Sequence, residues 1–317
     1  MFTKEKLEFI MLVGTPASGK TTATAKYIAM GYEVFSSDDV RAEIQAKIER
    51  GELVIPSNAT LNSLVFEAIK ARIIQALKAG RSVVFDATNL GRRRRMNFKS
   101  ALYKIDCVKI CMIFITSVEE CIKRNALREG IARVPDDAMY RMFCSFECPN
   151  YWEGWDKIIP VVDKVPYEFD YQQTVGFSQD NPHHTLSLDG HMEAAYKYAV
   201  EQGFNETVQK MAKIHDIGKV YTKAFENRKG EKTEVAHFYG HENYGAYLYL
   251  TESCCGKQLT QEQFNQILYE TNLINCHMRP LNVWRDCPRV KEKDKKLFGE
   301  QFFNDLIHLN CCDKAAH

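Results

Sequence analysis

Histidine is absent from the first 182 residues of this 317-residue chain, and all nine histidines lie at or beyond His183. Imidazole is the usual protein ligand of catalytic transition metals and a frequent acid or base. A histidine-ligated metal site is therefore excluded from the first half of the chain. We expect the two halves to carry out different chemistry.

Cysteine motifs and long apolar runs are also lacking. No two of the 11 cysteines have the spacing of a zinc ribbon or a thioredoxin motif. Their odd number, in a sequence without a recognisable signal peptide, favours reduced thiols and a cytoplasmic protein. The only early apolar stretch, Phe9 to Val13, is too short to span a bilayer, so we expect no membrane association.

A strong charge imbalance is lacking as well. The formal net charge is +1, so no global basic field surrounds the molecule, and any nucleic acid must be bound by local patches. The hydrophobic fraction of 45% predicts packed cores. The length is sufficient for two domains of ordinary size.

Short apolar strands alternate with helical segments in the first half of the chain. This pattern predicts an α/β domain with a parallel sheet flanked by helices. The predicted strands are 8–13, 33–36, 82–86, 108–115 and 157–163. The predicted helices are 19–30, 38–50, 61–79, 92–104, 118–129 and 136–147.

The alternation stops between Val165 and Asn181, where we place the domain boundary. The predicted divisions are a first domain at 1–168, a linker at 169–180 and a second domain at 181–317. Beyond the boundary only helical periodicity persists, in 187–202, 205–214, 240–250, 261–277 and 297–313. The second domain is therefore predicted to be all-α.

A phosphate-binding loop is predicted directly after the first strand. Its motif, G-x-x-x-x-G-K-[ST], is present as Gly14-Thr15-Pro16-Ala17-Ser18-Gly19-Lys20-Thr21. In such loops the backbone N–H groups surround the phosphates, the lysine reaches the β and γ phosphates, and the Thr21 hydroxyl binds Mg²⁺. The alternative is a glycine-rich turn without a ligand, which the full motif and its strand–helix context disfavour. The sequence therefore predicts the use of ATP, or another nucleoside triphosphate, with Mg²⁺.

Candidate acceptor residues follow the next two strands. Asp38 comes just after the second strand, where a carboxylate can take a proton from an attacking hydroxyl, and Arg41 lies one helical turn later, where it can hold an anion. The alternative is that Asp38 is only an N-cap and Arg41 is solvated. Asp86, Thr88 and Asn89 end the third strand at the same sheet edge and could order Mg²⁺ or the acceptor.

Several arginines are candidates for phosphate contacts. Arg124, Arg128 and Arg133 bracket a predicted break near Gly130. Arginines on a mobile segment can close over a phosphoryl group in transfer, although a solvated basic helix is the alternative for any one of them. The run 92–95 is either a solvated face or a patch that binds a strand.

These motifs resemble the 5′-hydroxyl polynucleotide kinases of the P-loop superfamily over about residues 8–165. The shared elements are the phosphate loop, Asp38-Asp39-Val40-Arg41, Asp86-Ala87-Thr88-Asn89-Leu90, Lys123-Arg124-Asn125 with Arg128, and Val134-Pro135. The resemblance implies Asp38 as the general base, Arg41 as a ligand of the acceptor phosphate, and Arg128 as a lid arginine, with Arg124 beside the nucleotide. Several small-molecule kinases share parts of this set, so the acceptor stays open.

Histidines and aspartates of the second half recur on separate predicted helices. The set comprises His191, His215, Asp216, His241, His277 and Asp313. Side chains from several helices that meet inside a bundle are a common way to build a metal site. Each histidine alone is more readily explained as a core or surface residue, but the set as a whole predicts metal binding.

This arrangement resembles the HD phosphohydrolase superfamily over about residues 181–313. By position, the resemblance implies one metal bound by His191, His215, Asp216 and Asp313, and a second bound by His241 and His277 with Asp216 bridging. His237 competes with His241 for that role, and Lys219 and His184 would hold the substrate phosphate. The mixed set suits Mn²⁺, Fe²⁺, Ni²⁺, Co²⁺ or Zn²⁺, and metal binding lowers the pKa of water to about 7.

Together the two halves predict a bifunctional enzyme that heals RNA or DNA ends. The first would phosphorylate 5′-hydroxyl ends. The second would remove 3′-phosphate or 2′,3′-cyclic phosphate, in place of the D-x-D-x-T phosphatase that this sequence lacks. A polynucleotide ligase would act next. Two alternatives stay open: a small-molecule kinase fused to an HD nucleotidase, and a nucleotide-sensing regulator with a non-catalytic HD module.

Overall fold

The computed structural model describes residues 6–182 and 185–316 of the chain. They form two compact units. The first comprises the chain up to Thr116, Cys121–Val134 and Pro149–Val161, and the second comprises Ser117–Glu120, Pro135–Cys148 and the chain from Val162 onward. His184, predicted to hold a substrate phosphate, lies outside the described residues.

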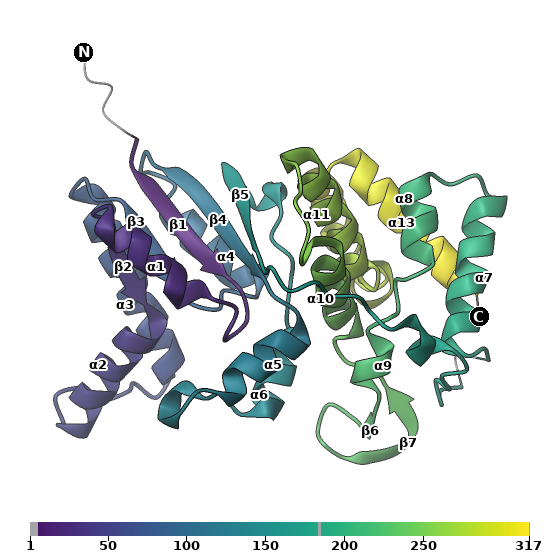
Figure 1. Cartoon of the computed structure of the whole chain (residues 1–317), viewed down its shortest axis with the longest axis horizontal. Coiled ribbons are helices and arrows are strands. Elements are labelled where there is room, and N and C mark those ends of the chain that lie inside the picture. Colours follow the sequence, from purple (N-terminus) through teal and green to yellow (C-terminus); the bar gives the residue numbers. More distant parts are fainter. Residues whose placement is uncertain (1–5, 183–184, 317) are drawn as a thin grey trace. The chain divides into compact units, whose positions relative to one another are not determined.

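The first unit is built on a parallel sheet (Figure 1). In the described part of the chain its strand order is β2-β3-β1-β4-β5, with β1 parallel to β3 and β4, and β2 parallel to β3. The elements are β1 (Glu8–Val13), α1 (Lys20–Ala29), β2 (Glu33–Ser36), α2 (Ser37–Glu49), α3 (Leu61–Lys78), β3 (Val83–Asp86), α4 (Arg92–Ala101), β4 (Val108–Ile115), α5 (Val118–Ala126), the 3₁₀ helices η1 (Gly130–Ala132) and η2 (Tyr151–Glu153), and β5 (Lys157–Val162). A parallel sheet with flanking helices fits the predicted P-loop kinase fold.

Both faces of this sheet are covered, which explains the continuous apolar runs of its strands. Successive side chains of a strand point to opposite faces. On one face, Tyr27 of α1 packs in a core that includes Ile10. On the other, Phe66 of α3 and Phe98 of α4 pack around Phe85, whose ring stacks on that of Phe98 with centroids 4.5 Å apart.

The carboxyl ends of β1, β2 and β3 meet at one edge of the sheet because the three strands are parallel. Ser36 and Asp86 end their strands as register partners, and the phosphate loop follows Val13 at the end of β1. The strand order therefore brings the phosphate loop, Asp38 and Asp86 to one edge, although they are far apart in the sequence.

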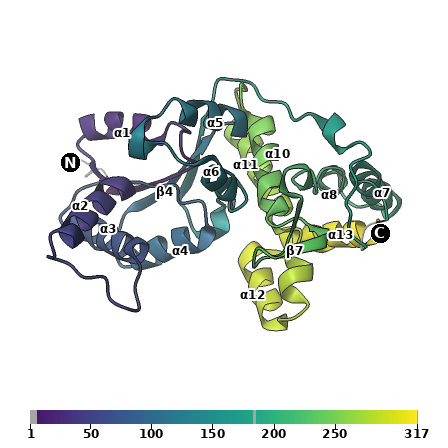
Figure 2. The ribbon, with the colours of Figure 1, turned by 90° about the horizontal axis from the view of Figure 1, so that it is seen from below.

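The second unit is mainly helical. Helices α10 and α11 pack side by side, and α13 packs against α7 and α8 (Figure 2). The elements are α6 (Asp136–Phe143), the 3₁₀ helix η3 (Tyr171–Thr174), α7 (Leu188–Glu201), α8 (Glu206–Ala212), α9 (Lys219–Thr222), β6 (Ala224–Glu226), β7 (Lys232–His237), α10 (His241–Cys254), α11 (Gln261–Cys276), the π-helix η4 (Pro280–Trp284), α12 (Pro288–Phe298) and α13 (Glu300–Ala315). Among residues 6–182 and 185–316, no helix has the length and apolar character needed to cross a bilayer.

The all-α prediction for the second half is wrong in one place. Strands β6 and β7 form an antiparallel hairpin in which Ala224 pairs with His237. The side-chain oxygen of Asn227 stabilises the turn, since it accepts hydrogen bonds from the N–H groups of Lys229 and Glu231. The strands have only 3 and 6 residues and carry few apolar side chains, so they contain too little of the pattern by which strands are recognised.

Helix α6 was predicted within the first domain, but it belongs to the second compact unit. The rings of Phe143 and Phe146 each lie 5.0 Å from the ring of Tyr247 on α10. The segment predicted as a linker, 169–180, also packs in this unit through the buried side chains of Phe169 and Gln179. Both placements depend on contacts that are distant in sequence, which local patterns do not contain.

Candidate active sites

The phosphate loop closes tightly over the end of β1. Glycine is required at position 14, because a Cβ atom on Gly14 would lie 2.7 Å from the Oγ of Ser18 and 3.0 Å from the Cβ of Phe114. The N–H of Gly14 donates to the carbonyl of Thr88 at 3.0 Å, which ties the loop to the segment after β3. The loop leads directly into Lys20, the first residue of α1, as a phosphate-binding loop requires.

Lys20 is a buried cation at the base of this loop. Its ammonium group donates to the carbonyl of Thr15 at 2.6 Å. Burial lowers the pKa of Lys20 to about 8, although the carboxylate of Asp86 opposes the shift. A bound polyphosphate would stabilise the charged form of this lysine.

Thr21 and Asp86 form a candidate Mg²⁺ site beside the loop. The hydroxyl of Thr21 donates to Oδ2 of Asp86 at 3.1 Å. Burial raises the pKa of Asp86, while Lys20 and Thr21 oppose that rise. A hydroxyl and a carboxylate are oxygen ligands of the kind that Mg²⁺ prefers, so the pair fits the ion that a P-loop binds.

Asp38 lies exposed in the first turn of α2, at the same sheet edge. The N-cap of α2 is Ser36, whose Oγ accepts a hydrogen bond from the N–H of Asp38 at 3.2 Å, so the carboxylate of Asp38 is not used as the cap. Its negative charge favours the protonated form of Lys20. Arg41 is half-buried, and Arg94 lies within its electrostatic reach, since the pKa of Arg94 is lowered by burial and further by Arg41. Arg41, one helical turn after Asp38, suits an acceptor that carries a phosphate.

Asn89, predicted as a substrate ligand, supports the loop instead. Its side chain is fully buried, and its Nδ2 donates to the carbonyl of Leu12 at 2.8 Å. The side chain of Thr88 is half-buried. Of the three residues predicted after β3, Asp86 and Thr88 therefore remain candidates for contact with ligands, because the amide of Asn89 points into the protein.

A buried ion pair that no sequence motif indicated holds this segment in place. Arg95 contacts Glu153 through two hydrogen bonds of 2.8 and 2.5 Å. Its Nη1 also donates to the carbonyls of Asn89 and Leu90, and the indole of Trp155 donates to Glu153 at 3.0 Å. Arg95 is fully buried and so is not part of a solvated face or a strand-binding patch, as the run 92–95 had suggested.

Glu153→Ala is expected to lower the free energy of unfolding by about 3–5 kcal/mol, because the guanidinium of Arg95 would stay buried without its counter-ion. Urea unfolding followed by circular dichroism measures the change. The matched control is Glu52→Ala, which breaks the exposed pair with Arg50 and should have little effect. Equal stability of the two variants would contradict the structural role of the buried pair.

The segment after α5 carries Arg128 and is closed by Asn125. The buried amide of Asn125 donates to the carbonyl of Val134 at 2.7 Å and accepts from its N–H at 3.1 Å. Nη1 of Arg128 donates to the carbonyl of Ala132, and its positive charge contributes to the lowered pKa of Lys20. Arg128 therefore lies within electrostatic reach of the phosphate loop, which a lid arginine must do, and Arg124 is half-buried on α5.

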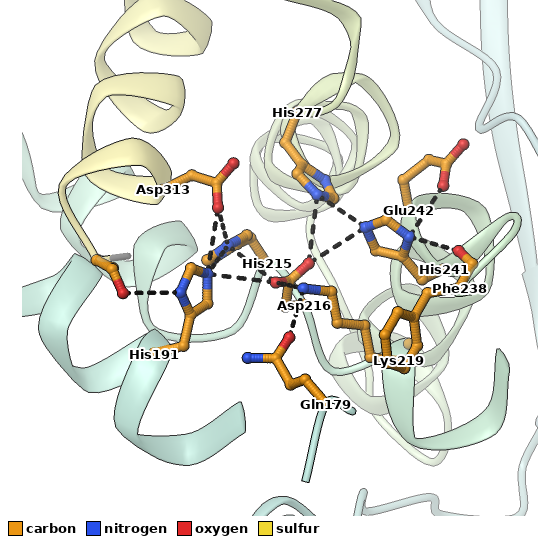
Figure 3. Close-up of polar contacts among 12 residues, drawn as sticks. Gln179, His191, His215, Asp216, Lys219, Phe238, His241, Glu242, His277 and Asp313 are labelled. Carbon is orange, nitrogen blue, oxygen red and sulfur yellow. Dashed lines mark hydrogen bonds and ion pairs between the residues drawn. The ribbon is translucent and has the colours of Figure 1, made fainter. Parts of the chain in front are cut away.

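Histidine and aspartate side chains of the second unit converge in its interior (Figure 3). Separate elements position them, and all of them are buried. The candidate ligands are His191 from α7, His215 and Asp216 from the turn after α8, His241 from the start of α10, His277 from the end of α11, and Asp313 from α13. The structure thus brings together the full set that the sequence predicted.

The first group of ligand atoms comes from four of these residues. Nε2 of His191 lies 3.4 Å from Nε2 of His215 and 3.2 Å from Oδ1 of Asp313. Oδ2 of Asp216 lies 3.4 Å from both imidazole nitrogens. One ion could therefore contact all four side chains.

The second group shares Asp216 with the first. Oδ1 of Asp216 lies 3.2 Å from Nε2 of His241 and 3.4 Å from Nε2 of His277. The two imidazole nitrogens are 3.2 Å apart. The carboxylate of Asp216 thus presents one oxygen to each group, which is the geometry of a bridging ligand.

Hydrogen bonds fix the proton position on the four imidazoles. Each Nδ1 lies 2.7–3.2 Å from a backbone carbonyl, and since a carbonyl only accepts, the proton must be on Nδ1. Each Nε2 then faces the cluster, where it either carries a second proton or gives its lone pair to a cation, because facing lone pairs repel. Ligands of one divalent metal with bonds of about 2.1 Å are about 3.0–3.4 Å apart, which agrees with these contacts. The donor set therefore fits two transition metals that share Asp216.

The negative charges of Asp216 and Asp313 also favour cations in the cluster. Burial acts to raise the pKa of Asp216, but Lys219 and His215 hold it well below its usual range. Burial acts in the same way on Asp313, and hydrogen bonds from His191 and His215 outweigh it and keep its pKa low. Burial lowers the pKa of His191, yet the two carboxylates raise it overall to about 9. The interior thus holds two ionised carboxylates, whose charge Lys219 balances together with protons on the histidines or metal ions.

Lys219 lies beside the bridging carboxylate. Its Nζ is 2.7 Å from Oδ2 of Asp216 and donates to Oε1 of Gln179 at 2.8 Å. Gln179 was not among the predicted site residues, because it lies in the segment predicted as a linker. Its buried side chain orients the lysine that the sequence assigned to the substrate phosphate.

A pocket of about 330 Å³ opens onto the cluster. Asp216, Lys219, His241 and Asp313 line it, so a ligand in the pocket can reach both groups. His237 also lines the pocket but belongs to neither group of ligand atoms. Of the two histidines predicted as alternatives for the second group, only His241 therefore lies among the candidate ligand atoms.

Comparison with known proteins finds relatives of the N-terminal half of the chain. Residues 9–149 match a family model described as an AAA domain. Heterogeneous nuclear ribonucleoprotein U-like protein 2 of Homo sapiens is 26% identical over 166 residues, which are 49% of this chain and 22% of that protein. The bifunctional polynucleotide phosphatase/kinase of Schizosaccharomyces pombe is 27% identical over 177 residues, 54% of this chain and 36% of that protein.

A solved structure of the Pnkp1/Rnl/Hen1 RNA repair complex contains a chain that is 23% identical to this one, with 44% of each chain covered and a TM-score of 0.36. The chain spans only 22% and 36% of the lengths of the two curated relatives. The N-terminal half of the chain therefore matches an AAA domain and contains a phosphate loop, and a polynucleotide phosphatase/kinase is among its relatives.

Proposed function

We propose that the chain is a bifunctional enzyme that heals nucleic-acid ends. The first unit would phosphorylate 5′-hydroxyl ends with ATP, and the second would hydrolyse 3′-phosphate or 2′,3′-cyclic phosphate ends. The observation that carries the proposal is the combination, in one chain, of a phosphate loop with the buried four-histidine, two-aspartate cluster. RNA is the favoured substrate, because cleaved RNA commonly leaves a 5′-hydroxyl and a 2′,3′-cyclic phosphate.

In the first unit the protein would act by positioning and charge neutralisation. Asp38 takes the proton of the attacking 5′-hydroxyl. A bond forms between that oxygen and the γ-phosphorus as the bond to the β–γ bridging oxygen breaks, and Lys20 neutralises the charge that develops there. Arg41 holds the phosphate next to the acceptor, and Arg128 closes over the transferred group.

The choice of a polynucleotide acceptor is supported by a relative, since the protein from Schizosaccharomyces pombe is named a polynucleotide phosphatase/kinase. Mg²⁺ held by Thr21 and Asp86 would complete the nucleotide site, with Arg124 near the nucleotide. A small-molecule acceptor is the competing possibility and is separated by the assay described below.

In the second unit the ligand set would hold two divalent metals, of the series Mn²⁺, Fe²⁺, Ni²⁺, Co²⁺ or Zn²⁺. When bound, such ions polarise a phosphate ester and lower the pKa of water to about 7, which provides a nucleophile at neutral pH. The backbone carbonyls orient the imidazoles, and Lys219 presents its positive charge to the substrate phosphate at the pocket wall.

Phosphorylation gives a 5′-phosphate, and hydrolysis of a 3′-phosphate gives a 3′-hydroxyl and inorganic phosphate. A 2′,3′-cyclic phosphate needs two hydrolyses, ring opening to a monoester and then removal of that monoester. The final ends are those that a polynucleotide ligase joins. A ligase that acts on the products is therefore the expected partner. A regulator without turnover would not need a complete set of ligand atoms at metal-binding distances, so the geometry favours an active hydrolase over a non-catalytic module.

An RNA oligonucleotide with a 5′-hydroxyl and a 2′,3′-cyclic phosphate tests the proposal. We expect mass spectrometry to show gain of a 5′-phosphate and opening or loss of the 3′-phosphate after incubation with protein, ATP, Mg²⁺ and Mn²⁺ or Ni²⁺. The control omits ATP, which should abolish only the 5′ change. An unchanged oligonucleotide, with ATP consumed when nucleosides or sugars are supplied, would instead support a metabolite kinase.

A further inference from the structure

The pocket above the metal-ligand cluster has walls that the proposed chemistry does not use. One wall comes from the β6–β7 hairpin and the segment that follows it, and it includes Arg228, His237 and Tyr239. Another part of the lining follows α11 and includes Met278 and Leu281. Binding a phosphate needs only the cations at the floor, so these walls point to a larger ligand.

Planar groups are stacked along the hairpin wall. The guanidinium carbon of Arg228 lies 5.0 Å from the ring centroid of Tyr239. The ring of His237 lies 5.2 Å from that of Tyr239, and the two planes differ by only 10°. Tyr239 is 38% exposed and Arg228 is exposed, so the stack is accessible from solvent at the pocket.

The backbone places this stack close to the candidate metal ligands. Tyr239 precedes His241 by two residues, so their Cα atoms are at most about 7 Å apart, at about 3.3–3.6 Å per residue. Gly240 between them has φ of 78°, and a Cβ atom there would lie 2.6 Å from the carbonyl oxygen of Cys144. Glycine thus permits the sharp turn that lets the exposed ring of Tyr239 and the buried imidazole of His241 line the same pocket.

We propose that Arg228, His237 and Tyr239 form a subsite for the base of the nucleotide whose phosphate is hydrolysed. This inference rests on the proposed hydrolase function. A base would extend the stack of planar groups, since every base has a π face, while the positive charge of Arg228 would attract the neighbouring backbone phosphate. The volume of about 330 Å³ lies at the lower end for ligand pockets and suits one terminal nucleotide rather than a duplex.

Tyr239→Ala is the first test, measured on a 3′-phosphorylated RNA oligonucleotide with Mn²⁺. We expect KM for 3′-phosphate removal to rise about 10-fold with a smaller change in kcat, because base–aromatic stacking is lost while the metal ligands stay. Tyr239→Phe should stay near the wild type because it keeps the ring. Phe225→Ala is the matched control, since Phe225 is exposed on the same hairpin but does not line the pocket.

An oligonucleotide that ends in an abasic 3′-phosphorylated ribose makes the test specific. The wild type should show the raised KM on this substrate, and Tyr239→Ala should raise it no further, because the interacting base is already absent. An equal effect of Tyr239→Ala on complete and abasic ends would overturn the base subsite while leaving the hydrolase intact. Hydrolysis of p-nitrophenyl phosphate but of neither oligonucleotide would overturn the proposed nucleic-acid function itself.

A free 2′,3′-cyclic nucleotide distinguishes a polynucleotide end from a metabolite. The subsite predicts that Tyr239→Ala raises KM for this substrate as well. Preference of the wild type for the free nucleotide, with the same dependence on Tyr239, would support the base subsite and overturn the assignment to nucleic-acid ends.

Discussion

Asp216→Ala is expected to remove both divalent metals and to lower hydrolysis of 3′-phosphate ends by more than about 100-fold. The physical reason is that Asp216 gives one carboxylate oxygen to each group of ligand atoms, so its loss damages both at once. Metal content by mass spectrometry and the rate of 3′-phosphate release measure the two effects. Phosphorylation of 5′ ends should continue, because the P-loop lies in the other compact unit.

Variants of a single group provide the control for this prediction. His277→Ala should lower the metal content by about one equivalent, since His277 belongs only to the second group, and Asp216→Ala should lower it by more. The comparison separates a bridging ligand from an ordinary one. A folded Asp216→Ala protein that keeps its metals and its hydrolase activity would contradict the assignment of the cluster.

Lys20→Ala is expected to reduce 5′ phosphorylation by at least about 10³-fold and to leave 3′-phosphate hydrolysis unchanged. Lys20 is the buried cation of the phosphate loop, and burial lowers its pKa to about 8, so a bound anion would stabilise its charged form. Transfer of labelled phosphate from ATP to a 5′-hydroxyl oligonucleotide measures the effect. Loss of both activities in a folded Lys20→Ala protein would count against independent sites.

Asp38→Asn is the companion variant for Lys20→Ala. It is nearly isosteric and removes the proposed base without touching the phosphate loop, so turnover should fall by orders of magnitude while ATP still binds. Lys20→Ala should weaken ATP binding as well. Near-normal turnover of Asp38→Asn would exclude this carboxylate as the base.

Elements whose signal lies in a short stretch of chain were predictable. The strands at 33–36 and 108–115 have the predicted bounds, and the phosphate loop connects β1 with α1 as its motif requires. Helix α2 begins at Ser37 behind the Ser36 cap, one residue before the predicted start. These elements are specified by an apolar run, by glycines or by a capping residue. Each of these signals acts on neighbouring residues, so the local sequence is enough to predict the element.

Features that depend on distant contacts were missed. Arg95 reads as part of a basic run, yet Glu153, 58 residues away, holds it in the core. Gln179 was predicted to lie in a linker, yet its Oε1 accepts a hydrogen bond from Lys219 in the site. The sequence of helix α6 does not indicate that it belongs to the second unit, because the ring of Tyr247 that packs against Phe143 comes from a distant part of the chain.

The P-loop and the six candidate metal ligands could be predicted without the structure. Residue type and spacing within short segments specify a nucleotide loop, and the histidines and aspartates supply imidazole and carboxylate groups. The resemblance also implied two ligand groups that share Asp216, and the side chains lie in such groups. The choice left open, between His241 and His237, needed the tertiary structure, in which only His241 belongs to a group of ligand atoms. Ligand geometry at distances of about 3 Å is set by the packing of helices that are far apart in sequence, and by the carbonyls that fix each imidazole.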